Sequence, residues 1–151
     1  MKKSLLKIAI ALGLACLTGL ALLACNSSAK ATDQERDTAR ARKTAEKAGI
    51  DTEKNSAVLI TRRDLRDNTR VTIIGVLRQV GTARFPEVVI TPPAGFDVDL
   101  NIDKKSMDKY AELYNNYVTV TGLLKIELVR YGDIERERYS MTLDAPPKLV
   151  L

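Results

Sequence analysis

Residues 96–103 alternate strictly between apolar and polar side chains, and this alternation permits only one kind of regular structure. The apolar members are Phe96, Val98, Leu100 and Ile102, and the polar members are Asp97, Asp99, Asn101 and Asp103. Successive side chains of a β-strand point to opposite faces, so each set would lie on a face of its own. The segment therefore predicts a half-buried strand of an antiparallel sheet.

The segments around this strand predict four further strands and one helix. Runs rich in β-branched or alternating apolar residues occupy residues 71–78, 88–91, 117–129 and 139–143. Turn signals fall at residues 81–86, 92–95 and 130–136. One apolar stripe at helical spacing is formed by Met107, Tyr110, Ala111 and Tyr114. Asp103 or Ser106 can cap this helix, and the predicted order is three strands, one helix and two strands.

Two of the predicted strands have similar sequences, each with a glycine near its middle. Residues 68–78 (NTRVTIIGVLR) match residues 115–125 (NNYVTVTGLLK), and Gly75 corresponds to Gly122. A glycine within a strand suits a sharp bend. This repeat, together with the helix between the third and fourth strands, resembles the OB-fold, a five-stranded Greek-key barrel. The resemblance implies an all-β barrel with one helix over residues 56–151; another small β-sandwich or barrel is the alternative.

The first 24 residues have the organisation of a bacterial export signal. Three lysines, the last of them Lys7, precede an apolar run over residues 8–23. This run is shorter than the ~20 residues that a membrane-spanning helix usually needs. It ends in Leu22-Leu23-Ala24-Cys25, which resembles the lipobox of bacterial lipoproteins. The resemblance implies cleavage before Cys25 and attachment of acyl chains, such as palmitate, that anchor the protein to a membrane. An ordinary signal or an uncleaved anchor is the alternative.

These signals divide the chain into a signal peptide over 1–24, a lipidated polar tether over 25–55 and a domain over 56–151. Within the tether, Thr32 and Glu35 predict a capping box, and Gly49 predicts the end of a helix over 33–48. Apart from alanines this helix has no apolar stripe, so we interpret it as a spacer. Contact of its basic residues with anionic lipid or peptidoglycan is the alternative reading.

The residue after Cys25 bears on the destination of the protein. Asn26 stands where aspartate tends to retain proteobacterial lipoproteins in the inner membrane. The resemblance therefore implies the outer membrane, facing the periplasm, with the outer face of the cytoplasmic membrane as the alternative.

Composition excludes several kinds of chemistry. The chain has no histidine, and Cys16 and Cys25 are its only cysteines. If Cys16 leaves with the signal and Cys25 carries lipid, zinc sites built on Cys or His, haem attachment and Ser-His-Asp or Cys-His catalysis are all excluded. An enzyme would have to rely on carboxylates, lysine or tyrosine. We predict a protein that is not an enzyme and that needs no metal or cofactor.

Nucleic acid is also a poor candidate ligand. Residues 1–24 contain three lysines and no acid, so the rest of the chain holds 21 basic and 19 acidic residues, a net charge of +2. Proteins that bind single strands need stacking aromatics in a basic groove, whereas the third strand offers a row of aspartates. Loose binding of a divalent cation by that row is a weaker possibility. The S-x-x-K motif at Ser106–Lys109 lacks partner motifs, and capping explains Ser106.

Two predicted loops carry arginines and aromatic residues near the face that OB-folds use. That face lies on the second and third strands, between the first loop and the last hairpin. The candidate ligand-binding residues are Arg78, Arg84, Phe85, Arg130, Tyr131, Arg136 and Arg138. Arginine forks and aromatic rings recognise anionic or sugar-like ligands and acidic protein surfaces. Ordinary solvated tips, with Glu135 and Glu137 neutralising the arginines, are the alternative.

Together these patterns predict an exported, lipid-anchored binding or adaptor lipoprotein of the bacterial envelope. It would engage an envelope protein, or an anionic or glycan ligand, through its loop tips. A structural envelope lipoprotein without a specific ligand is the alternative. An enzyme that uses paired carboxylates is a third hypothesis, and it requires a pocket with two convergent acids.

Overall fold

The structure is a computed structural model that describes residues 33–150. The predicted signal, Cys25, Asn26 and the capping residue Thr32 lie outside the described residues. By its contacts the chain divides into Met1–Arg36 and Asp37–Leu151, and the description below concerns the second unit. No helix in the described part is both long and apolar enough to cross a membrane.

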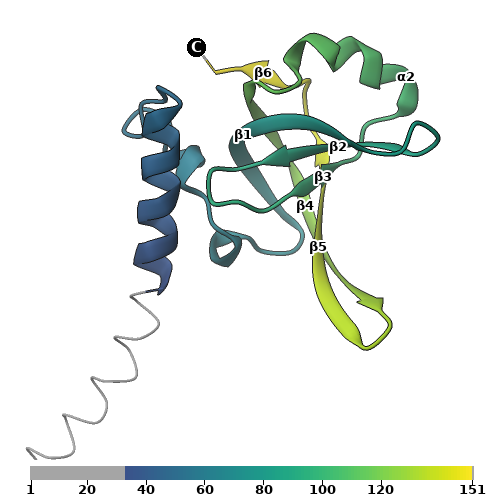
Figure 1. Ribbon diagram of the computed structural model, residues 1–151, viewed down its shortest axis with the longest axis horizontal. Helices are drawn as coiled ribbons and strands as arrows, with labels where there is room; N and C mark the ends of the chain where they lie inside the picture. Colours follow the sequence, from purple (N-terminus) through teal and green to yellow (C-terminus); the bar gives the residue numbers. More distant parts are fainter. Residues whose placement is uncertain (1–32, 151) are drawn as a thin grey trace, which may run out of the picture. The chain divides into compact units, whose positions relative to one another are not determined.

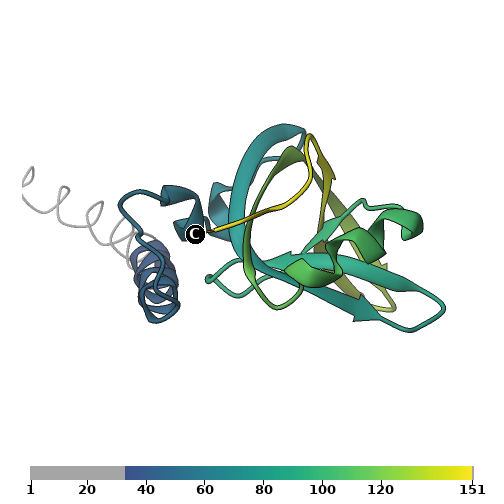
Figure 2. The same ribbon diagram turned by 90° about the horizontal axis from the view of Figure 1, so that it is seen from above.

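Five strands of this unit form a closed ring (Figures 1 and 2). The strands are β1 (Thr69–Gly81), β2 (Pro86–Thr91), β3 (Val98–Leu100), β4 (Tyr117–Tyr131) and β5 (Ile134–Leu143). Their spatial order is β1-β2-β3-β5-β4, and β4 pairs again with β1. The β3–β5 pairing is parallel, and the other pairings in the ring are antiparallel. The predicted mostly-β fold is confirmed, and a two-residue strand β6 (Lys148–Leu149) adds to β4.

Two predicted bounds are wrong in an informative way. The strand predicted over residues 96–103 has only three residues, although its alternation holds, since Phe96, Val98 and Leu100 are buried. The loop predicted over 130–136 is instead almost entirely strand, because β4 and β5 stay paired up to Tyr131 and Ile134. Both faces of this projecting hairpin are exposed to solvent, so its strands can carry charged side chains. A run of charged residues therefore does not indicate a loop here.

The helix predicted after the third strand is a short α-helix, α2 (Lys104–Met107), followed by a 3₁₀ helix, η3 (Asp108–Leu113). Asp103 caps α2, because its carboxylate accepts hydrogen bonds from the Ser106 backbone N–H (2.9 Å) and hydroxyl (2.8 Å). These bonds lower the pKa of Asp103. Of the two predicted caps, Asp103 or Ser106, the structure has Asp103 as the cap and Ser106 as its hydrogen-bond donor. This helical segment lies at the end of the ring opposite the β4–β5 hairpin tip (Figure 1).

All five ring strands contribute to one buried core. Its fully enclosed large side chains include Ile73, Leu77, Ile90, Leu124 and Met141. Because side chains alternate along each strand, every residue that points into this core has neighbours that point out of the ring. The interior of the ring is therefore filled, and the polar side chains of the strands lie on its outside.

A second, smaller core involves the helix over residues 33–47. Ala41 and Ala45 are fully buried, and Ala45 clusters with Ile50, Val58 and the β1 residue Ile74. The helix ends as predicted at Gly49, whose φ is +75°. The N–H of Ile50 bonds to the carbonyl of Ala45 at 3.0 Å, which closes the helix end. The helix therefore has a buried face, and the alanines, which are its only apolar residues, contribute that face.

Candidate functional site

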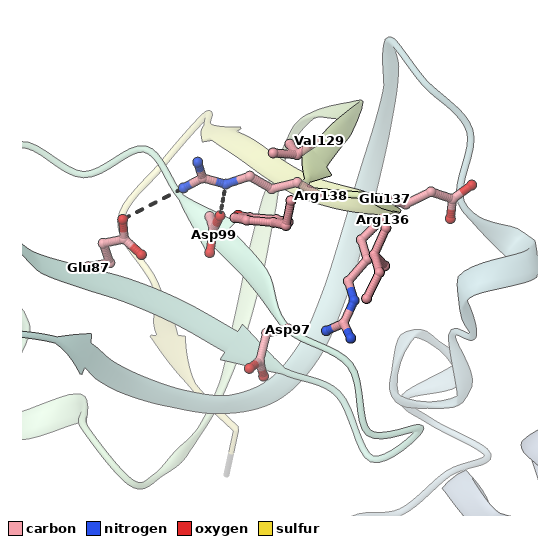
Figure 3. Close-up of a pocket in the computed structure, with 9 residues that line it drawn as sticks. Glu87, Asp97, Asp99, Val129, Arg136, Glu137 and Arg138 are labelled. Carbon is pink, nitrogen blue, oxygen red and sulfur yellow. Dashed lines mark hydrogen bonds and ion pairs between the residues drawn. The ribbon is translucent and has the colours of Figure 1, made fainter.

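A groove of about 750 Å³ lies outside the ring, where β2 and β3 meet the distal half of the β4–β5 hairpin (Figure 3). Its lining residues are Glu87, Asp97, Asp99, Val129, Tyr131, Ile134, Arg136, Glu137 and Arg138. Asp99 lies between the buried Val98 and Leu100, so strand alternation turns it outward. The same alternation turns Arg138 outward beside the buried Tyr139.

Arg138 is held by acids from the two neighbouring strands. Its Nε donates a hydrogen bond to Oδ2 of Asp99 at 2.6 Å, and its Nη2 lies 3.7 Å from Oε1 of Glu87 (Figure 3). The bond to Asp99 is the main cause of the raised pKa of Arg138. Arg138 therefore links β5 to β3 and β2, and its charge is already matched within the protein.

Arg78 holds a second acid of the groove from outside it. Its Nη2 donates to Oδ1 of Asp97 at 2.8 Å, and its Nε donates to Oγ1 of Thr91 at 3.0 Å. The Thr91 hydroxyl in turn donates to the same Asp97 oxygen at 2.6 Å. Arg78 does not line the groove, but its hydrogen bond helps to hold the carboxylate of Asp97 in position.

Arg136 differs from these two arginines. It lines the groove, it is exposed, and its side chain makes no hydrogen bond or ion pair within residues 33–150. Figure 3 shows its side chain extending into the groove, whereas that of Glu137 points away. Arg136 is thus a charged group of the groove that remains available to a ligand.

An apolar wall stands beside this free guanidinium. Val129 pairs with Arg136 across the hairpin, and Tyr131 pairs with Ile134, so the four side chains share one face. Tyr131 is 64% exposed and Ile134 is 55% exposed. Exposed aromatic and aliphatic side chains next to an unpaired cation can bury apolar area and bind an anionic group at once.

The structure brings together only part of the predicted site. Tyr131, Arg136 and Arg138 line the groove, and Arg78 touches a lining residue. Arg84 and Phe85 lie in the β1–β2 loop outside the groove, and Phe85 is 77% exposed. Arg130 faces the other side of the hairpin, where it lies 3.6 Å from its cross-strand partner Glu135.

Sequence reasoning missed most of the apolar and acidic lining. Ile134 falls within residues 130–136, where the turn signals predict a loop to which no face can be assigned, and Val129 is the last residue of the strand predicted over 117–129. Continuing the period-two pattern of β4 and β5 across Gly132-Asp133 would have placed both residues beside Arg136.

The groove contains several carboxylates, which is the feature that the enzyme hypothesis required. Asp99 and Glu87 contact Arg138, and Asp97 contacts Arg78 and Thr91. Glu137 accepts a hydrogen bond from the hydroxyl of Tyr139, whose pKa burial raises to about 12. Each of these acids already has a partner, so the groove offers no pair of unengaged carboxylates.

The predicted acidic row is also divided in the structure. Asp97 and Asp99 line the groove, whereas Asp103 caps α2. Among residues 33–150, no three acidic side chains gather as a metal site would require.

Comparisons with known proteins found no relative that would indicate a function. No known protein-family model matches the chain, and no curated protein shows significant similarity to it.

Proposed function

We propose that this protein is a lipid-anchored binding lipoprotein of the bacterial envelope, whose OB-fold holds a segment of an envelope protein in the groove beside the β4–β5 hairpin. The OB-fold assignment is supported by the ring order β1-β2-β3-β5-β4, the parallel β3–β5 pair and the helical segment between β3 and β4. The groove lies on the outer face of β2 and β3, which is the face that OB-folds usually use.

The observation that carries this proposal is the free guanidinium of Arg136 beside the exposed Tyr131 and Ile134. A guanidinium without an internal partner favours a carboxylate or phosphate, to which it donates charge-assisted hydrogen bonds. The opposite wall holds Asp97 and Asp99, which would repel a densely charged polyanion. A ligand with one anionic group next to an apolar group suits both walls. A protein segment has this character, and a nucleic acid does not.

The anchor is the second part of the proposal. Replacing Cys25 by serine removes the thiol that would take the lipid, so the protein should move from the membrane fraction to the soluble fraction or remain as an unprocessed precursor. Mass spectrometry of the purified protein should then show no acyl chains. Cys16→Ser is the matched control and should leave processing and anchoring unchanged. A Cys25→Ser protein that stays membrane-bound with its signal removed would contradict lipidation at Cys25.

Groove binding can be tested in native membranes with a photo-crosslinking phenylalanine derivative. Placed at Tyr131, it should crosslink to a discrete envelope protein, because that side chain lines the groove. Placed at Leu128, which is 72% exposed but points to the other face of the hairpin, it should not. Arg136→Glu should reduce the Tyr131 crosslink at least tenfold, whereas Arg130→Glu should leave it unchanged.

The same experiment decides between binding and a purely structural role. Equal, diffuse labelling from Tyr131 and Leu128, unaffected by Arg136→Glu, would favour a structural envelope lipoprotein without a specific ligand. We propose binding rather than catalysis because the carboxylates of the groove are engaged by arginine or tyrosine.

A further inference from the structure

In the distal half of the β4–β5 hairpin, β4 and β5 pair only with each other, because the pairing of β4 with β1 ends at Leu124. β5 pairs with β3 only at Ser140 and Met141, whereas its pairing with β4 continues to Ile134. The hairpin accordingly projects past β3 (Figure 1). The edge of β5 over residues 134–137 is therefore not covered by any strand in the described part of the chain.

The register shows which backbone groups lie on this edge. The carbonyl of Met141 accepts a hydrogen bond from the N–H of Asn101 at 2.9 Å, so the backbone groups of Met141 face away from β4. Backbone groups alternate in direction along a strand. Those of Glu135 and Glu137 therefore face the same way as those of Met141. Two N–H donors and two carbonyl acceptors thus form a short template for an added strand.

A second copy of this chain does not suit the edge. In a two-fold antiparallel pairing, residues that lie opposite each other must point to the same face. Centring the pairing on Arg136 sets Arg136 opposite Arg136 and Glu135 opposite Glu137. Centring it on Glu137 sets Arg136 opposite Arg138. Like charges directly opposite each other are destabilising, so the alternating charges protect the edge against self-association and favour a different chain.

We propose that the free edge of β5 binds an extended segment of a different protein as an added β-strand. On the groove face of that segment, an acidic side chain would lie opposite Arg136 and an apolar side chain would lie beside Ile134 and Tyr131. On the other face, basic side chains would lie opposite Glu135 and Glu137. The inference deepens the proposed groove binding and rests on it.

The test uses the full lipidated protein in detergent micelles and synthetic peptides as probes. An antiparallel strand that satisfies the charges has the core sequence Thr-Lys-Glu-Lys-Val, with its Glu opposite Arg136. Adding this peptide should slow hydrogen exchange of the Glu135 and Glu137 amides at least tenfold, measured by NMR. The amides of Ile134 and Arg136 face β4 and should change little.

Two variant peptides separate an added strand from side-chain binding alone. N-methylation of both lysines, which lie opposite Glu135 and Glu137, removes the backbone donors and should weaken binding at least tenfold. Replacing the peptide Glu by Lys should abolish binding to the wild type, and Arg136→Glu should restore it. Equal binding of the N-methylated peptide would overturn strand addition while leaving groove binding intact. Failure of every peptide would overturn the inference, and the Tyr131 crosslink would still decide the proposed function independently.

Discussion

Replacing Gly122 by alanine is expected to lower the free energy of unfolding by about 3 kcal/mol. Gly122 lies in β4 opposite Leu143 of β5, where the two backbones approach closely. An added Cβ would overlap the carbonyl oxygen of Thr142 and would lie 2.9 Å from Cγ of Met141. A backbone carbonyl within a closed ring cannot move aside without disturbing the neighbouring pairs. Urea denaturation followed by circular dichroism measures the loss.

Gly49→Ala is a useful control because it separates steric conflict from backbone strain. Gly49 has open space around its Cβ position but a φ of +75°, so its replacement should cost only about 1–2 kcal/mol. Where no atom is in the way, replacing a strand glycine by alanine should instead stabilise the folded protein by about 0.4–1 kcal/mol, because alanine lowers the conformational entropy of the unfolded chain. A Gly122→Ala protein as stable as the wild type would therefore mean that β4 and β5 do not approach as described.

Replacing Leu124 by alanine is expected to cost about 2–5 kcal/mol, because it opens a cavity at the centre of the ring. Leu124 is fully buried and belongs to the core that all five ring strands share. The adjacent Leu123 offers a matched comparison, since it is the same residue type on the opposite face and is 48% exposed. Leu123→Ala should change stability by only about 0.5 kcal/mol.

The two leucine variants together test the face assignment of β4. A one-residue shift in register would exchange the buried and exposed positions of the whole strand. The groove would then lose its lining, because Val129 and Tyr131 share the outward face of β4 with Leu123. Equal losses for the two variants, or a larger loss for Leu123→Ala, would contradict both the core and the groove.

Local pattern was sufficient for the features that depend on a few neighbouring residues. The alternation of 96–103 correctly predicted which side chains of that segment are buried. Asp103 was one of the two caps that the sequence offered, and Ser106, to which it bonds, lies only three residues away. Gly49 was identified as a helix end because a left-handed residue at that position favours glycine. For the cap and for the helix end, the determining contact joins residues no more than five positions apart.

Burial of the helix over residues 33–47 could not be predicted in the same way. Its polar residues are those of a solvated helix, and its buried face consists of alanines such as Ala41 and Ala45. A small side chain buries little area alone, so it gives a weak pattern. Its burial depends on the partners that Val58 and Ile74 provide.

By itself, the sequence determined that this chain carries strands of alternating character and a set of arginines near two turns. Only the tertiary structure decided which of the two arginines that line the groove is free. Arg136 and Arg138 are two residues apart on one face of β5, yet Arg138 meets Asp99, 39 residues away, and Arg136 meets no acid of the described chain. The parallel register of β3 against β5 ends before Arg136. Charge pairing across a sheet depends on that register, which no local pattern encodes.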